Sequence, residues 1–269
     1  MNLENGFNLV LSGGAALGYA HIGVVDYLHS INLEPTTYHG VSMGAIVASI
    51  EALDISHQRK QELYSEVFSS LKWVRVKLNG ALISTSKIEE ILDNIFGKLH
   101  FSHLKKELHI IATNYHTGEL TIFNRANDIL IKDAILASMA VPALFPPREI
   151  NKEIYVDGYL SSNLPLASID NNLPNLVVNV TSKNSFEKLD VASLQDLSIF
   201  SNLERSIRIL IYNQTKDALN SFKKDYILIE PPLFNYKTSH FYKFEEIKDI
   251  GFASAKESLG DLIPATFAI

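Results

Sequence analysis

The sequence predicts an α/β fold built on a mainly parallel sheet. Within the first 53 residues, a short apolar run twice ends in a glycine-containing turn and continues directly into helical spacing. These two strand–turn–helix units occupy residues 7–31 and 36–53. Because only one helix separates the two turns, we expect the strands to be parallel neighbours, with both turns at the carboxyl ends of the strands.

The second turn carries the pattern Gly-x-Ser-x-Gly, with Ser42 between Gly40 and Gly44. Small residues on both sides permit a sharp strand-to-helix turn that exposes the serine hydroxyl at the sheet edge. The helix that follows directs unpaired N–H groups toward this position and favours negative charge there. These features suit a nucleophile in acyl transfer. The structural alternative is a turn that uses small residues only for packing.

The first turn, Ser12 to Gly18, is compatible with three roles. It could bind a phosphate as in dinucleotide-binding folds, form an oxyanion hole, or let a helix pack closely on a strand. Phosphate binding is disfavoured because the spacing G-x-G-x-x-G is absent. Since the loop is expected to lie beside Ser42, its backbone N–H groups are expected to face the serine.

Later stretches predict the remaining elements of one domain that covers residues 1–269. Helices are expected at 56–69, 86–96, 127–140, 191–222 and 245–262, and strands at 108–114, 120–124, 154–159, 175–180 and 226–230. The turn at 116–119 joins two of these strands in a hairpin. Residues 70–82 alternate apolar and basic side chains around Trp73, which predicts either a strand or an amphipathic flap, with core packing favoured for the tryptophan.

Charge and composition exclude several functional classes. The net charge is −6 with no long basic run, which disfavours nucleic acid as a partner and a polybasic membrane tether. No apolar stretch reaches the roughly 18–20 residues that span a bilayer, and the N-terminus lacks the basic start of a signal peptide. The absence of cysteine excludes disulfides, thiolate metal sites and a cysteine nucleophile. We therefore expect a cytoplasmic protein without a metal or cofactor, although signal-independent export would leave no trace in the sequence.

Three stretches taken together resemble the patatin-like phospholipase family. They are SGGAALG at 12–18, GVSMGA at 40–45 and VDGYLSSNLP at 156–165. A fourth stretch, SMAVPALFPP at 138–147, resembles the segment that precedes the family's aspartate. The resemblance spans roughly residues 7–166 in the family's order, and the combination is more specific than any single stretch.

This resemblance implies a three-layer α/β/α sandwich, completed by residues 175–269, that hydrolyses lipid acyl esters. The expected partners are a lipid or acyl-ester substrate and, transiently, a membrane surface. By position, Ser42 would be the nucleophile and Asp157 its partner in a Ser–Asp dyad. The oxyanion hole would be formed by the backbone of Gly13, Gly14 and Ala15, and the motif glycines would be Gly18, Gly40, Gly44 and Gly158.

Two residues depart from the family pattern. Leu17 stands where Arg or Lys is frequent, and Tyr159 follows Asp157-Gly158 where a small residue is common. A cation at position 17 could assist a lipid phosphate, so Leu17 bears on headgroup preference. Tyr159 is expected to narrow the site.

The residues leave the base of the reaction open. A carboxylate has an ordinary pKa near 4 and is a weak base, so a dyad requires partial burial that raises the pKa of Asp157. One alternative is a Ser–His–Asp hydrolase that uses His240 or another of the nine histidines. The other is an inert lipid-binding or regulatory protein on the same fold, which Leu17 slightly favours.

Overall fold

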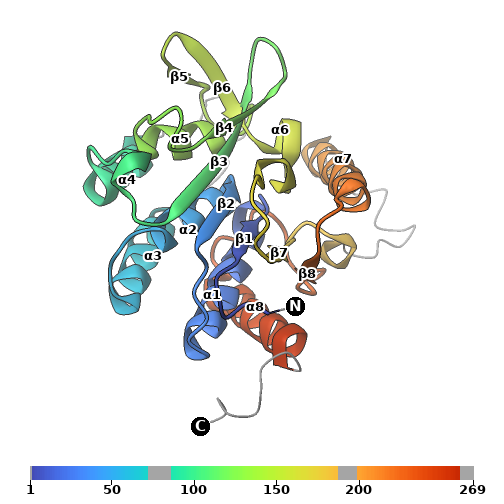
Figure 1. The fold of residues 1–269 in the computed structure, drawn as a ribbon. Helices are drawn as coiled ribbons and strands as arrows, with labels where there is room; N and C mark the ends of the chain where they lie inside the picture. Colours follow the sequence, from blue (N-terminus) through green and yellow to red (C-terminus); the bar gives the residue numbers. More distant parts are fainter. Residues whose placement is uncertain (1, 72–85, 187–198, 261–269) are drawn as a thin grey trace.

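The computed structural model describes residues 2–71, 86–186 and 199–260 and places eight strands of these segments in one sheet (Figure 1). Five strands run parallel in the order β3-β2-β1-β7-β8, and they are β1 (Asn8–Leu11), β2 (Thr37–Val41), β3 (Glu107–Asn114), β7 (Asn175–Val178) and β8 (Tyr226–Ile229). Three antiparallel strands extend this sheet beside β3, and they are β4 (Leu120–Phe123), β5 (Arg148–Ile150) and β6 (Glu153–Asp157). The predicted parallel pairing of the first two strands is confirmed, with Leu9 opposite Tyr38.

Neighbouring residues of the central strands face two different cores. In β1, Leu9 and Leu11 pack in the larger core, whereas Val10 belongs to a smaller cluster on the other face. In β7, Leu176 lies in the larger core and Val177 in the smaller cluster. Burial on both faces explains why these strands are continuous apolar runs rather than alternating ones.

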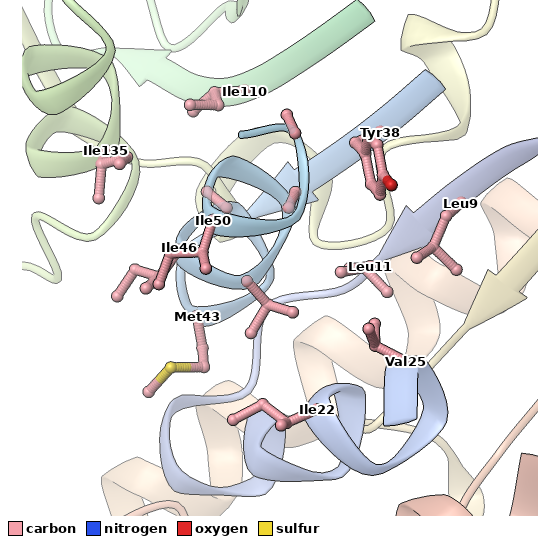
Figure 2. Packing of buried hydrophobic residues seen from close by; sticks show 14 of the residues in the cluster. Leu9, Leu11, Ile22, Val25, Tyr38, Met43, Ile46, Ile50, Ile110 and Ile135 are labelled. Carbon is pink, nitrogen blue, oxygen red and sulfur yellow. The ribbon is translucent and has the colours of Figure 1, made fainter. Parts of the chain in front are cut away.

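Helices cover both faces of the sheet. The larger core is packed by α1 (Tyr19–Ser30), α2 (Met43–Glu51), α3 (His57–Leu71), α4 (Ser86–Phe96), α5 (Ile131–Ser138) and α8 (Phe244–Leu259). Figure 2 shows Met43, Ile46 and Ile50 of α2 within this core. On the other face, α7 (Ile199–Ser221) contributes Ala218 and Leu219 to the smaller cluster. The expected three-layer α/β/α sandwich is therefore confirmed.

The strand expected at 175–180 ends at Val178. Two further predicted boundaries need correction, because local side-chain hydrogen bonds end the regular structure. The helix expected at 127–140 begins only at Ile131, since Asn127 accepts a hydrogen bond from the Asn124 N–H (2.9 Å) and Asp128 adopts a positive φ of 40°. The strand expected at 154–159 ends at Asp157, whose side chain accepts a hydrogen bond from the N–H of the second residue along the chain.

Two short elements of the structure were not expected from the sequence, and two expected segments lie wholly or partly outside the described residues. The short strand β5 and the short helix α6 (Tyr159–Ser162) were not anticipated. The amphipathic stretch at 70–82, with Trp73, falls almost entirely outside the described residues, as does the beginning of the helix expected at 191–222. The described part of that helix is α7.

Glycines set the spacing between α1 and α8. A Cβ on Gly23 would lie 2.6 Å from the Phe252 nitrogen, and a Cβ on Gly251 would lie 2.6 Å from the carbonyl carbon of Ala20. Because the obstructing atoms are backbone, neither helix can yield by moving a side chain. The two helices can therefore pack at this distance only with glycine at both positions.

We predict that Gly23→Ala lowers the free energy of unfolding by about 2–3 kcal/mol, since α8 must move away from α1 to admit the methyl group. Urea denaturation monitored by circular dichroism measures this change in the free energy of unfolding. Gly260→Ala is the matched control, because a Cβ there would have no atom of the described residues within 4 Å, so this substitution should leave stability nearly unchanged. Equal stability of Gly23→Ala and the wild type would contradict the backbone overlap.

Candidate active site

Ser42 lies at the turn between β2 and α2 in a backbone conformation that is rare for a residue with a side chain. Its φ is 52° and its ψ is −119°. The turn can close only because residues 40 and 44 have no side chain. A Cβ on Gly40 would lie 2.5 Å from the Gly44 carbonyl oxygen, and a Cβ on Gly44 would lie 2.6 Å from the Ser12 carbonyl oxygen, and both distances are too short. A strained serine between two obligatory glycines is the geometry of a nucleophile elbow.

A second serine holds this turn in place. The Ser42 N–H donates a hydrogen bond to Ser138 Oγ (2.8 Å), and Ser138 Oγ donates to the Ile111 carbonyl oxygen (2.6 Å). Ser138 is fully buried at the end of α5. No role for Ser138 was expected from the sequence, where its only signal was its place at the start of the family-like segment 138–147.

Ser42 and Asp157 are brought together because β2 and β6 pair with the same edge of β3. Val41, the last residue of β2, pairs with Ile111, and Asp157, the last residue of β6, pairs with Ala112. Since β4 pairs with both of these β3 residues from the opposite edge, β2 and β6 share the remaining edge and meet end to end. Two side chains 115 residues apart in sequence are thereby brought together.

The two side chains are in direct contact. Ser42 Oγ donates a hydrogen bond to Asp157 Oδ2 (2.7 Å), and the Tyr159 N–H donates to Asp157 Oδ1 (3.0 Å). Burial raises the pKa of Asp157 to about 7, and the hydrogen bonds from Tyr159 and Ser42 limit the rise. Ser42 retains 9% exposure, so the contact lies just below the surface. A carboxylate with this pKa can exchange a proton with the serine near neutral pH.

The glycine loop lies beside Ser42, but one of its three expected donors is already occupied. A Cβ on Gly13 would lie 3.3 Å from the Ser42 Cβ. The Gly13 N–H donates to the Asn163 carbonyl oxygen (3.1 Å), which removes it from the expected oxyanion hole. The N–H groups of Gly14 and Ala15 are the remaining candidates, and Ala15 has a positive φ of 48°. The Gly13 N–H therefore helps to position the loop, and the role of the loop as an oxyanion hole stays a prediction.

Asn163 is a second residue that the sequence analysis did not single out. It is almost fully buried, and its Nδ2 donates to Thr181 Oγ1 (2.8 Å) and to the Gly13 carbonyl oxygen (3.4 Å). Its backbone N–H donates to Gln214 Oε1 on α7 (2.8 Å). Asn163 therefore connects the glycine loop to α7 and to the segment that follows β7. The family-like stretch 156–165 contained it without indicating this role.

The other singled-out residues occupy packing positions around the turn. Gly18 lies against the Met43 side chain, and Gly158 lies against the Ile111 carbonyl oxygen. Leu17 is fully buried in the larger core, so its side chain cannot meet a lipid headgroup. Tyr159 is half-buried, and burial beside Asp157 raises its pKa to about 12.

The described histidines near the site make structural contacts. His21 Nε2 is 2.8 Å from the Ser12 carbonyl oxygen, and complete burial lowers its pKa to about 4. His39 Nδ1 is 2.7 Å from Ser168 Oγ, and its ring stacks on His109 with centroids 4.6 Å apart. His240 Nδ1 accepts a hydrogen bond from the Lys237 N–H (3.3 Å). Ser42 bonds directly to Asp157, with no imidazole between them.

The described residues contain neither a metal-binding group nor a membrane-spanning helix. Residues 2–71, 86–186 and 199–260 contain no group of three or more His, Asp or Glu side chains arranged to hold a metal ion. In the same segments, no helix combines the length and apolar character needed to cross a bilayer.

We predict that the stability of the wild type falls by about 3 kcal/mol between pH 5 and pH 8 through Asp157 alone, at about 1.4 kcal/mol per pKa unit. The folded-state pKa of about 7 exceeds the unfolded value near 4, so the native state binds the proton more tightly. The resulting stability is fully present below the unfolded pKa and is lost as the pH rises through 7. Asp157→Asn, which has no proton to release, should lack this loss in parallel urea titrations. Parallel pH profiles for the two proteins would contradict the raised pKa.

Comparison with known proteins identifies relatives for this fold and site. The family model described as Patatin-like phospholipase matches residues 9–170. An uncharacterised NTE family protein of Mycobacterium tuberculosis is 28% identical over 160 residues, which are 58% of this chain and 27% of that protein. Lysophospholipase NTE1 of Meyerozyma guilliermondii is 25% identical over 283 residues, with 93% of this chain and 19% of that protein covered. The chain thus spans about a quarter or less of the length of these two relatives.

A solved structure shares the fold. VipD from Legionella pneumophila superposes with a TM-score of 0.55 at 16% identity and covers 95% of this chain and 67% of its own. At this identity the similarity concerns architecture only. The family model, in contrast, matches more than half of the residues and includes the glycine loop, Ser42 and Asp157. The chain belongs to the patatin-like phospholipase family.

Proposed function

We propose that this chain is a serine hydrolase of lipid acyl esters, of the phospholipase A or lysophospholipase type, that uses a Ser42–Asp157 dyad. The observation that carries the proposal is the direct 2.7 Å hydrogen bond from Ser42 Oγ to a buried carboxylate, at a strained turn. Membership of the patatin-like phospholipase family and similarity to a lysophospholipase support a lipid substrate.

In the proposed reaction, Ser42 Oγ attacks the carbonyl carbon of the ester while Asp157 Oδ2 accepts the hydroxyl proton. The tetrahedral intermediate collapses, the ester C–O bond breaks, and the leaving alcohol takes the proton back from Asp157. A water molecule then attacks the acyl-enzyme and gives its proton to Asp157. The bond between Ser42 Oγ and the acyl carbon then breaks, and Asp157 returns the proton to Ser42 Oγ as the fatty acid leaves. The two half-reactions thus consume one water and regenerate the enzyme.

The negative charge of the intermediate needs donors on the glycine loop. We assign this role to the N–H groups of Gly14 and Ala15, because the Gly13 N–H is bound to Asn163. Each such donor typically contributes on the order of 3 kcal/mol of transition-state stabilisation. Since α2 begins directly after Ser42, its N-terminal dipole adds a favourable field at the same place.

The two competing functions receive less support. A Ser–His–Asp triad requires an imidazole between serine and carboxylate, a position that the direct contact leaves no room for. An inert lipid-binding protein has no need for a strained serine or for a buried carboxylate whose pKa is raised to about 7. Burying that group costs stability, which favours a function for it.

We predict that Ser42→Ala and Asp157→Asn each lower turnover of a p-nitrophenyl acyl ester by about a thousandfold or more, since each removes a reacting group. A fluorophosphonate probe should label wild-type Ser42 and leave Ser42→Ala unlabelled. His240→Ala is the control and should retain activity. Full activity in Asp157→Asn would eliminate the dyad, and loss of activity in His240→Ala would favour the triad.

A second prediction concerns the pH dependence of catalysis. Because only the ionised carboxylate accepts a proton, kcat/KM should rise about tenfold per pH unit below pH 7 and level off above it. Initial rates on a soluble ester between pH 5 and pH 9 measure this profile. A rate that is constant over this range, or that falls with increasing pH, would be inconsistent with Asp157 as the base.

A further inference from the structure

Helix α7 is connected to one end of the glycine loop through Asn163. Gln214 Oε1 accepts the Asn163 N–H (2.8 Å), and the Asn163 carbonyl oxygen accepts the Gly13 N–H (3.1 Å). Gln214 Nε2 also donates to the carbonyl oxygens of Tyr159 (3.3 Å) and Leu160 (3.4 Å) on α6. Figure 1 shows α6 and α7 side by side. This part of α7 therefore lies against the segment that directly follows Asp157.

The same helix is connected to the other end of the loop through Thr238. Glu204 Oε1 accepts a hydrogen bond from Thr238 Oγ1 (2.7 Å), and the Thr238 carbonyl oxygen accepts the Ala16 N–H (3.1 Å). Glu204 and Gln214 of the same helix are thus each connected to the loop by hydrogen bonds through one intervening residue. The stretch of α7 between them runs alongside the glycine loop.

The exposed side of this helix carries an apolar stripe. Ile199 is 90% exposed, Leu203 58% and Leu210 69%. At about 100° per residue, the three side chains fall within about 40° of one another, and Gln214 follows about 20° further round. The stripe therefore borders the side of α7 that faces α6. Leu160 of α6, 45% exposed, adds a fourth apolar side chain near the Gln214 end.

The charges around this stripe indicate which partner it fits. Glu204 is bonded to Thr238 and lies 3.8 Å from Arg208. Asp217, which is exposed, lies in line with Ile199 at the Gln214 end of the stripe and places a negative charge on this side of the helix. The protein carries a net charge of −6, which disfavours an anionic surface. A neutral or zwitterionic lipid layer accepts apolar side chains and imposes no such repulsion.

We propose that the stripe of Ile199, Leu203 and Leu210, with Leu160, docks on a zwitterionic lipid surface and so presents membrane lipids to Ser42. Only the choice of a lipid as the docked partner rests on the proposed hydrolase function. Docking acts through apolar burial, so it is insensitive to salt. Because α7 is connected to both ends of the glycine loop through Asn163 and Thr238, the docked surface lies close to the proposed oxyanion donors.

The test measures flotation with phosphatidylcholine vesicles on the Ser42→Ala background, in which hydrolysis plays no part. The double substitution Leu203→Glu, Leu210→Glu keeps good helix formers and should lower vesicle binding by about tenfold or more at low and high salt. Ile55→Glu is the matched control, since Ile55 is an exposed apolar residue (38%) beyond the far end of α2. Unchanged binding in the double variant, or equal loss in the control, would overturn the proposal.

A second measurement does not depend on the double variant folding. Because the chain has no cysteine, Leu210→Cys can be labelled at one position with a polarity-sensitive dye. Vesicles should shift its emission to the blue and leave a dye at Ile55→Cys unchanged, whereas no shift at Leu210→Cys refutes docking. Light scattering that shows a dimer disrupted by Leu203→Glu would instead assign the stripe to a second copy of the chain and refute the lipid surface.

On the active background, the ratio of vesicle hydrolysis to soluble-ester hydrolysis should fall by about tenfold in the double variant, in line with its vesicle binding. An unchanged ratio would contradict productive docking. If the wild type bound vesicles through the stripe but hydrolysed neither substrate, the docking surface would stand and the proposed hydrolase function would fail. The two proposals are thus separable.

Discussion

The site depends on one edge of β3 that serves two strands in succession. β2 pairs with this edge as far as Ile111, and β6 arrives from the opposite direction and takes over at Ala112. Two strand ends therefore meet head to head, and each carries a functional group just at the junction. The hydrogen bonds from Ser42 to Ser138 and from Ser138 to the Ile111 carbonyl anchor the nucleophile turn to the same edge.

Burial at this junction has opposite consequences for stability and for chemistry. Removing Asp157 from water raises its pKa to about 7, and the hydrogen bonds from Ser42 and Tyr159 favour its ionised form. At neutral pH, burial of this carboxylate lowers the stability of the fold. In the proposed mechanism, the same shift would allow this otherwise weak base to accept the serine proton without an imidazole.

Much of the scaffold was predictable because its signals are local. Continuous apolar runs such as Phe7–Leu11 identify strands buried on both faces, and Gly40 and Gly44 mark a turn that excludes side chains. The helix expected at 127–140 was wrong at its beginning, because Asn127 forms a side-chain turn that competes with helix. The roles of Ser138 and Asn163 could not be predicted, since each acts through partners far away in sequence.

By itself the sequence determined the fold class, the family and the residues at which chemistry was to be sought, because turn glycines and apolar periodicity are encoded within a few neighbouring positions. Tertiary structure decided which groups are usable. In the folded chain, Asp157 Oδ2 lies 2.7 Å from Ser42 Oγ, and burial raises the pKa of Asp157. The Gly13 N–H is bound to the Asn163 carbonyl oxygen, and the Leu17 side chain lies in the larger core. Desolvation and competition for hydrogen bonds depend on atoms from every layer of the fold, so no local stretch of sequence contains them.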